Sequence, residues 1–261
     1  MPVLSARGGR SAAAFGLGNG GFTPQALALF ARMTTPPTAP RKVAINRLYN
    51  DLISAGTLSK MDALYVFAAA DSQAARLNWI ASNSAATSGS PLFTADRGYS
   101  GNSGVGYLTG LTAASASQNN HHFAVWMRTA PASVGQMFLL NGSASSGLLR
   151  INPIDTSQMQ AASSDSGTIT AFSRTTGYIG VSRAGSGSYT RRNASTNNTV
   201  SVASTGFAGG TDSIMLADGA GSNIYDGQMS VAHYGSSLTG SELAATETAI
   251  QTYLTSVGAY P

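Results

Sequence analysis

The residues that most often carry catalysis are few in this chain of 261 residues. Its only glutamates are Glu242 and Glu247. Hydrolysis of a glycosidic bond by a general acid and base needs two carboxyl groups that flank the bond. Both glutamates fall in one C-terminal segment, where Glu242 fits a helix capping box, and the aspartates stand mainly at turn positions, where they stabilise turns. The sequence therefore predicts no catalytic residues and a protein that is not an enzyme.

Metal ligands are equally scarce. The histidines are His121, His122 and His233, and the chain has no cysteine. Adjacent side chains on a strand point to opposite faces, so the first two cannot share one ligand sphere, and no zinc-site spacing is present. The string Gly16-x-Gly18-x-x-Gly21 matches a dinucleotide fingerprint, but no strand precedes it. We therefore expect no metal, no cofactor and no disulfide.

One segment combines an aromatic ring with planar hydrogen-bonding groups around a Gly/Ser turn. Within residues 183–195, these side chains are Tyr189, Arg191, Arg192 and Asn193. Such groups suit sugars or anionic ligands, so these four residues are the candidate ligand-binding set. The alternative is a solvated hairpin whose arginines keep it soluble.

Composition excludes several classes of protein. Hydrophobic residues make up 43% of the chain and charged residues only 10%, with a net charge of +4. The 15 basic residues are scattered rather than gathered in a stripe, which disfavours nucleic-acid binding. No run of 18 apolar residues occurs, so no membrane insertion is expected. The N-terminus lacks the apolar stretch of a Sec signal peptide, and we expect the chain to be made in the cytoplasm.

Three helices are indicated by capping residues and apolar periodicity. The first spans 24–33 behind the N-cap Thr23. The second spans 41–55 and ends at Gly56. The third follows the capping box Thr239-Gly-Ser-Glu242 and ends at Gly258. The second helix has these apolar residues on one face: Ile45, Leu48, Tyr49, Leu52 and Ile53.

Short strand-like segments separated by Gly, Ser, Asn and Asp fill most of the remaining chain. An apolar run of strand length covers 63–69, and 71–80 fits one or two helical turns. The later strand-like segments are 91–95, 105–109, 121–129, 136–141, 147–152, 167–173, 177–183, 187–193, 198–203, 212–217 and 227–234. This spacing predicts an all-β sandwich or jelly roll, with Trp79 and Trp126 in its core.

The chain divides into an attachment arm, a helical segment and a sandwich. We expect a Gly/Arg-rich extended arm over 1–23, a helical linker over 24–60 and the β-sandwich with its C-terminal helix over 61–261. The arm is predicted to dock onto a neighbouring subunit or partner, and wrapping onto its own domain is the alternative. The candidate attachment residues are Arg7, Arg10, Phe15 and Phe22.

Several segments also carry a family resemblance by their order along the chain. They are 51–56 (DLISAG), 58–65 (LSKMDALY), 70–79 (ADSQAARLNW), 93–99 (FTADRGY), 122–129 (HFAVWMRT) and the helix that follows 237–242 (SLTGSE). From about Leu29 to Pro261, the chain resembles the concanavalin A-like lectin/LamG-type jelly-roll proteins of tailed bacteriophages and prophages.

This resemblance implies a mainly β, concanavalin A-like sandwich on a virion, as a tail fibre, baseplate appendage or head decoration. Other virion proteins, further copies of the chain and host-surface glycans are the partners it implies. The sequence departs from calcium-dependent lectins because it has no obvious Asp/Asn calcium loop. A soluble carbohydrate-binding module remains the main alternative. A sandwich-fold polysaccharide hydrolase is a weaker one, since glutamate is scarce.

Overall fold

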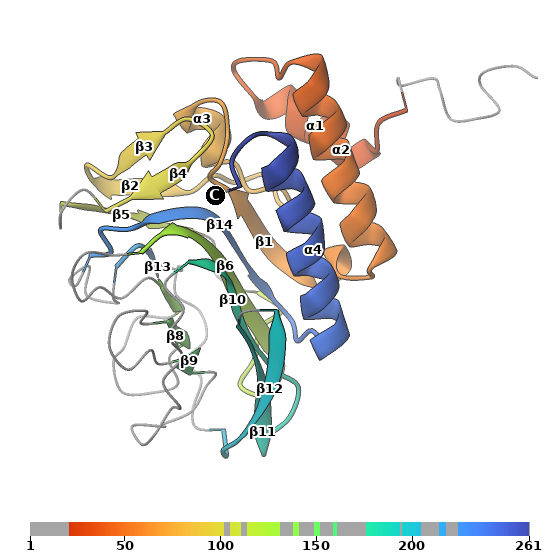
Figure 1. Ribbon diagram of the computed structural model, residues 1–261, viewed down its shortest axis with the longest axis vertical. Coiled ribbons are helices and arrows are strands. Elements are labelled where there is room, and N and C mark those ends of the chain that lie inside the picture. The colour runs from red at the N-terminus through yellow and green to blue at the C-terminus, as the bar shows by residue number, and fades with distance from the viewer. Residues whose placement is uncertain are drawn as a thin grey trace, which may run out of the picture.

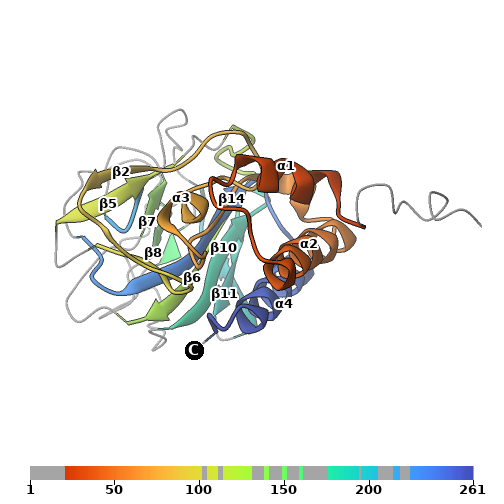
Figure 2. The same cartoon turned by 90° about the horizontal axis from the view of Figure 1, so that it is seen from above.

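The chain folds into three layers in the computed structural model: helices, a large sheet and a smaller sheet (Figures 1 and 2). The residues described are 21–101, 105–110, 114–130, 138–140, 149–151, 159–160, 176–193, 195–204, 214–217 and 224–260. The large sheet lies in the middle, with helices α1, α2 and α4 against one face and the smaller sheet against the other (Figure 2).

The helices are α1 (Pro24–Arg32), α2 (Ala39–Ser54), a 3-10 turn (Leu58–Lys60), α3 (Ser72–Ala75) and α4 (Gly240–Ser256). Helices α1 and α4 begin where their capping residues predict, whereas α2 begins two residues before the predicted start at 41. The Thr23 side chain accepts a hydrogen bond from the backbone of Ala26, and Thr239 and Glu242 form the expected capping box. Gly56 and Gly258 follow the helix ends with φ of 70° and 69°, a left-handed conformation that favours glycine.

The large sheet has eight strands among the described residues, and every neighbouring pair is antiparallel. Its strand order is β12-β11-β10-β6-β14-β4-β3, and β1 also pairs with β14. The strands are β1 (Met61–Val66), β3 (Leu92–Thr94), β4 (Gly98–Ser100), β6 (His121–Thr129), β10 (Gly177–Arg183), β11 (Ser188–Asn193), β12 (Thr196–Ser201) and β14 (Gln228–Gly235).

The smaller sheet has six strands in the described part of the chain, in the order β2-β5-β13-β7-β8-β9. They are β2 (Ala86–Gly89), β5 (Gly106–Thr109), β7 (Phe138–Leu140), β8 (Leu149–Ile151), β9 (Met159–Gln160) and β13 (Ile214–Met215). The two antiparallel sheets make a mainly β sandwich with a C-terminal helix, which confirms the predicted fold class.

The large sheet is buried on both faces, and β6 shows why the sequence there is continuously apolar. Phe123, Val125 and Met127 belong to the core between the two sheets. Ala124 and Trp126, which alternate with them, belong to the core under the helices. Because successive side chains of a strand point to opposite faces, one nine-residue strand serves both cores. Both tryptophans are buried, as predicted.

The helical segment 24–60 shares the second core rather than standing apart as a linker. Leu29 and Leu48 belong to the same cluster as Val231 of the large sheet. Arg32 also ties α1 to a loop of the sandwich, because its guanidinium donates to the carbonyls of Asn78, Ala81 and Asn83 at 2.6–2.7 Å. The segment is therefore fixed to the sandwich by apolar and polar contacts.

One prediction for these regions is wrong, and several concern residues outside the described ranges. Ile53, expected on the apolar face of α2, is 45% exposed. Phe22 packs edge-on against Phe30 of the same chain, with ring centroids 5.4 Å apart. The described residues do not include Arg7, Arg10, Phe15 or the expected strand 167–173.

Among the described residues, no helix is both long and apolar enough to cross a membrane.

Candidate functional site

The hairpin expected to bind ligand turns its aromatic ring into the protein. Tyr189 of β11 is 2% exposed and belongs to the core between the sheets. The Arg183 guanidinium lies 5.3 Å from the centre of its ring and is itself buried. The hairpin therefore does not present the aromatic face on which this candidate site depended.

The neighbouring arginines are buried as well. Arg192 donates from Nε to Glu247 of α4 at 2.5 Å, and both side chains are 7% exposed. Its Nη1 donates to Asn197 at 3.0 Å. Arg191 is 9% exposed, and Asn193 is half-buried. The arginines of the hairpin are thus buried rather than solvated, and Arg192 attaches the hairpin to α4.

A chain of hydrogen bonds connects two histidines between the large sheet and α4. His122 donates from Nδ1 to the carbonyl of Ser236 at 2.5 Å, so its Nε2 accepts from Nδ1 of His233 at 3.0 Å. The Tyr178 hydroxyl then donates to Nε2 of His233 at 2.9 Å. Every hydrogen-bonding proton of the network formed by His122, His233 and Tyr178 has an acceptor only while both imidazoles are neutral.

Burial enforces that neutral state. It lowers the pKa of His122 to about 4 and that of His233 well below its usual value. It also lowers the pKa of His121, which bonds to the Ser117 carbonyl, to about 4. No group of three potential metal ligands occurs within the described ranges. We interpret these histidines as structural.

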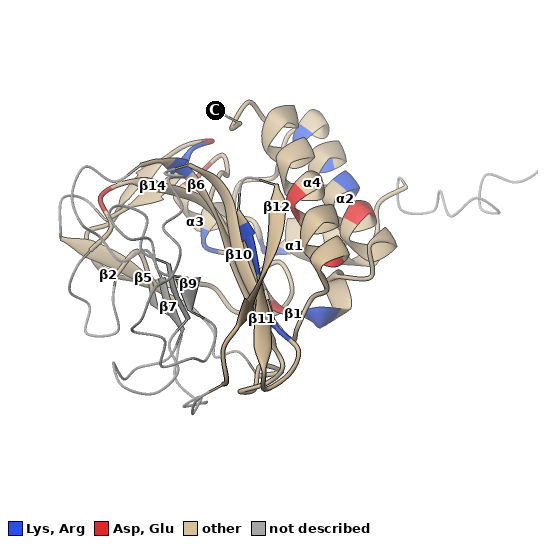
Figure 3. Ribbon diagram, turned by 60° about the horizontal axis from the view of Figure 1, so that its bottom comes forward, with Lys and Arg blue, Asp and Glu red and all other residues tan. Residues whose placement is uncertain are grey.

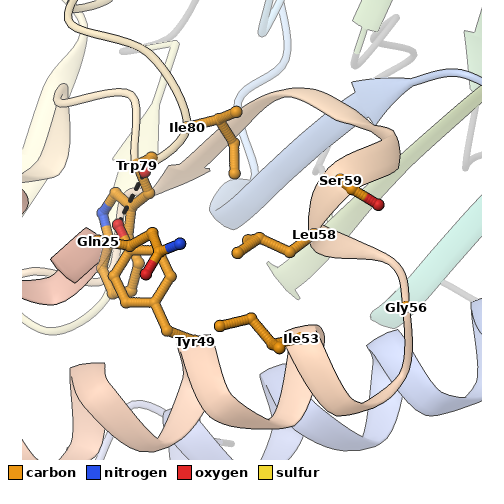
Figure 4. Close-up of a pocket in the computed structure, with 8 residues that line it drawn as sticks. All are labelled: Gln25, Tyr49, Ile53, Gly56, Leu58, Ser59, Trp79 and Ile80. Carbon is orange, nitrogen blue, oxygen red and sulfur yellow. Dashed lines mark hydrogen bonds between the residues drawn. The ribbon is translucent and has the colours of Figure 1, made fainter. Parts of the chain in front are cut away.

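A cavity of about 390 Å³ lies between α1, the C-terminal half of α2, the 3-10 turn and the loop at Trp79 and Ile80. Figure 4 shows Ile53, Leu58 and Ile80 on one side of it and Tyr49, Trp79 and Gln25 on the other. The Tyr49 hydroxyl donates to the Trp79 carbonyl at 2.8 Å, and burial raises its pKa. Its lining is mainly apolar, with Gln25 and Ser59 among its polar side chains, and holds no charged residue.

A polar cleft of about 270 Å³ lies where α3 meets β2, β3 and β4. We call it the Arg76 cleft. Its lining is formed by Ser72, Arg76, Thr87, Gly89, Ser90, Pro91, Phe93 and Tyr99. It brings together a guanidinium, an aromatic ring that is only partly buried, and several hydroxyl groups.

Backbone carbonyls hold Arg76 in place. Its Nε donates to the Ser72 carbonyl at 3.2 Å and its Nη1 to the Ala85 carbonyl at 3.5 Å. The Tyr99 hydroxyl donates to the same Ser72 carbonyl at 3.2 Å. Burial raises the pKa of Tyr99, although the positive charge of Arg76 acts to lower it. Among the described residues, no carboxylate pairs with Arg76.

The rim of the Arg76 cleft depends on a glycine. Gly89 ends β2 with a φ of 63°, and a Cβ there would lie 1.9 Å from the Val105 carbonyl oxygen of the next strand. Only glycine fits that conformation and that approach. Phe93 packs on Tyr99 with ring centroids 5.2 Å apart and remains half-buried.

A third cleft, of about 260 Å³, borders the hairpin and includes Ser182, Tyr189 and Thr239. The Ser182 hydroxyl donates to the Leu238 carbonyl at 2.6 Å and accepts from its backbone nitrogen at 2.8 Å. Since the Tyr189 ring is buried and this hydroxyl is already paired, the third cleft offers less for a sugar than the Arg76 cleft does.

Sequence reasoning did not single out Arg76 or Phe93. Both lie in the segments that carry the family resemblance. Trp79 follows Arg76 by three residues and Arg97 follows Phe93 by four, but neither segment has the adjacent arginines found at 191–192. Their proximity arises only when β3, β4 and α3 pack together. No signal in the linear sequence could have paired them.

Charge is sparsely distributed over the ribbon. Figure 3 shows the described Lys and Arg residues spread over several elements, among them three on α2 and two on β11.

Comparisons with known proteins inform on the fold. No protein-family model matches the chain, and no curated protein is significantly similar to it in sequence. Among solved structures, it is similar to domain 4 of AbnA, an extracellular GH43 arabinanase from Geobacillus stearothermophilus, solved in complex with arabinotriose. The TM-score is 0.50 at 14% identity, over 72% of this chain and 98% of that domain. The likeness shows that the chain has a β-sandwich fold.

Proposed function

We propose that this chain is a non-enzymatic, lectin-like β-sandwich that binds glycans through the Arg76 cleft and is displayed on a bacteriophage virion. The observation that carries the proposal is the arrangement of Arg76, Phe93 and the surrounding hydroxyls in one cleft. An aromatic ring offers a face for the C–H surface of a sugar, while hydroxyls and a guanidinium match its hydroxyl groups.

The similar solved structure supports the ligand class. Domain 4 of the arabinanase is a sandwich of related fold that was solved with arabinotriose. A sandwich of this kind can therefore serve as a sugar-binding scaffold. The position of the cleft in this chain is inferred from its own residues.

The placement of the glutamates supports a binding rather than a hydrolytic role. Glu242 receives two hydrogen bonds from Lys60, at 2.6 and 2.8 Å. Glu247 pairs with Arg192 and accepts from Ser195 at 2.9 Å. Neither lines the Arg76 cleft, and none of its described lining residues carries a carboxylate.

Binding by the isolated protein tests the glycan role. Phe93→Ala should weaken binding to glycans captured on an array by about tenfold, equivalent to about 1.4 kcal/mol. Leu92→Ala is the matched control, because Leu92 is the preceding residue of β3 and is 52% exposed without lining the cleft. Equal affinities for wild type and Phe93→Ala would contradict the proposed site.

The virion role is supported by the family resemblance. The arm, with Arg7, Arg10 and Phe15, is the proposed attachment to other virion proteins, and a homo-oligomer is the proposed assembly. A variant that lacks residues 1–20 keeps every described helix and strand, so it should fold and still bind glycan. Immunogold labelling of particles should then detect the full chain but not the truncated one. Full occupancy by the truncated chain would contradict the proposal.

A further inference from the structure

We infer that the Arg76 cleft recognises sugars that carry a carboxylate, such as uronic acids, rather than neutral sugars. This inference rests on the proposed glycan-binding function and names its ligand class. The observation behind it is a positive charge that is held in a cleft beside an aromatic ring and lacks an acidic partner among the described residues.

Other arginines of the chain have their charge or donors occupied by the protein itself. Arg192 pairs with Glu247, and Arg41 pairs with Asp96. Arg32 donates to three carbonyls in one loop. Arg76 also donates to carbonyls, but it differs from these three in lining the polar cleft with no carboxylate within salt-bridge distance among the described residues.

The acidic residue nearest to Arg76 in sequence has another role. The carboxylate of Asp71 accepts from the backbone nitrogens of Gln73 and Ala74, at 3.0 and 2.9 Å, and caps α3. Asp71 is absent from the described lining of the cleft. Asp71 is therefore engaged at the N-terminus of α3, while the Arg76 guanidinium contacts two backbone carbonyls and lies beside the Tyr99 hydroxyl.

Anchoring makes this charge useful for recognition. The bonds from Nε to Ser72 and from Nη1 to Ala85 fix the orientation of the guanidinium, so little freedom is lost when a ligand binds. A planar guanidinium matches the planar carboxylate of a uronic acid in charge and shape. The hydroxyls of Thr87 and Ser90 on the same cleft provide groups for the sugar ring.

The charge of the whole chain favours the same ligand. With 15 basic and 11 acidic residues, the protein carries a net charge of +4. A positive protein attracts an anionic polysaccharide and speeds the encounter, and salt weakens that attraction. A neutral glycan would gain nothing from this field.

Matched ligands test the inference directly. The full chain is titrated with oligomers of galacturonate, glucuronate and mannuronate, each compared with its neutral methyl ester, and with a panel of neutral oligosaccharides. At least one acidic oligomer should bind at least tenfold more tightly than its ester, and added salt should reduce that difference. Arg76→Gln should abolish the preference for the acid, and Arg76→Lys should retain part of it. Arg47→Gln, at an exposed position of α2, should leave the preference unchanged.

Two results would overturn the inference. If neutral oligosaccharides or esters bind as tightly as the acids, and Phe93→Ala weakens that binding while Arg76→Gln keeps it, the cleft is a neutral-sugar site and the proposed function stands. If neither acidic nor neutral sugars bind to the folded protein, the proposed function fails as well.

Discussion

Arg192 and Arg76 occupy opposite situations in the same sandwich. Arg192 is buried between β11 and α4 and is paired with Glu247, whereas Arg76 lines an open cleft and has no carboxylate partner among the described residues. The sequence context favoured Arg192, because it stands beside a second arginine and near a tyrosine. The difference shows that the availability of a charge, rather than its local sequence context, separates a binding residue from a structural one.

The same contrast applies to the aromatic rings. Tyr189 lies between the sheets under Arg183, while Phe93 remains half-buried at the cleft. Burial therefore predicts that substitutions in the hairpin change stability, whereas substitutions in the cleft change binding.

The largest effect is expected from breaking the buried ion pair. Glu247→Ala leaves the Arg192 charge uncompensated and should lower the free energy of unfolding by about 3–5 kcal/mol. Urea denaturation at pH 7 measures it. The double variant Arg192→Met with Glu247→Leu should recover much of the loss, since a well-packed apolar pair can replace a buried ion pair. A loss below about 1 kcal/mol for Glu247→Ala would contradict the structural role of the pair.

Tyr189→Ala should destabilise the protein by about 3 kcal/mol, because it removes a buried ring and leaves a cavity between the sheets. Thermal unfolding checks this. If the variant kept the melting temperature of the wild type and lost glycan binding, Tyr189 would be a ligand contact rather than a core residue.

Acid should destabilise the protein through its buried histidines. Their pKa values in the folded state are depressed, to about 4 for His121 and His122, against about 6.5 when unfolded. The unfolded state then binds more protons, so stability falls as the pH drops below about 6.5, and this loss is complete below about 4. Between pH 7.5 and 5 the cost should be about 2 kcal/mol per histidine.

Urea denaturation across that pH range measures the acid effect, and the window from pH 6.5 to 5 lies above the usual range of carboxyl groups. A free energy of unfolding that stayed constant through this window would mean that protonation of the hydrogen-bonded His122–His233 pair does not destabilise the fold.

The smallest effect on stability is expected at the cleft. Arg76→Gln removes a partly exposed side chain that makes two hydrogen bonds to carbonyls, at 3.2 and 3.5 Å, and should change the free energy of unfolding by no more than about 0.5 kcal/mol. The same denaturation series measures it. A loss of several kcal/mol would show that Arg76 is structural in the way that Arg192 is.

Much of the fold could be predicted from the sequence because its signals are local. The capping residues Thr23 and Thr239 marked two helices, and the apolar run of β6 marked a strand with the observed bounds 121–129. Strand β2 (Ala86–Gly89) escaped prediction because its four residues, ATSG, are small or polar and carry no alternation. It forms by pairing with β5, from which it is separated in sequence by β3 and β4.

The candidate site could not be predicted in the same way. Arg191 and Arg192 are adjacent and conspicuous, but Arg192 is paired with Glu247 of α4, which lies 55 residues later. Arg76 and Phe93 become neighbours only through the packing of α3 on β3 and β4. Sequence shows which charges exist, while tertiary structure decides which of them remain available to a ligand.

The most direct test of this account compares Arg76→Gln and Arg192→Gln in one pair of assays: affinity for a uronic-acid oligosaccharide bound by the wild type, and melting temperature. We predict that Arg76→Gln loses at least tenfold in affinity with an unchanged melting temperature. Arg192→Gln should melt several degrees lower and, where folded, bind like the wild type. Unchanged affinity in Arg76→Gln, with binding lost in a fully stable Arg192→Gln, would contradict the account and return the binding site to the hairpin.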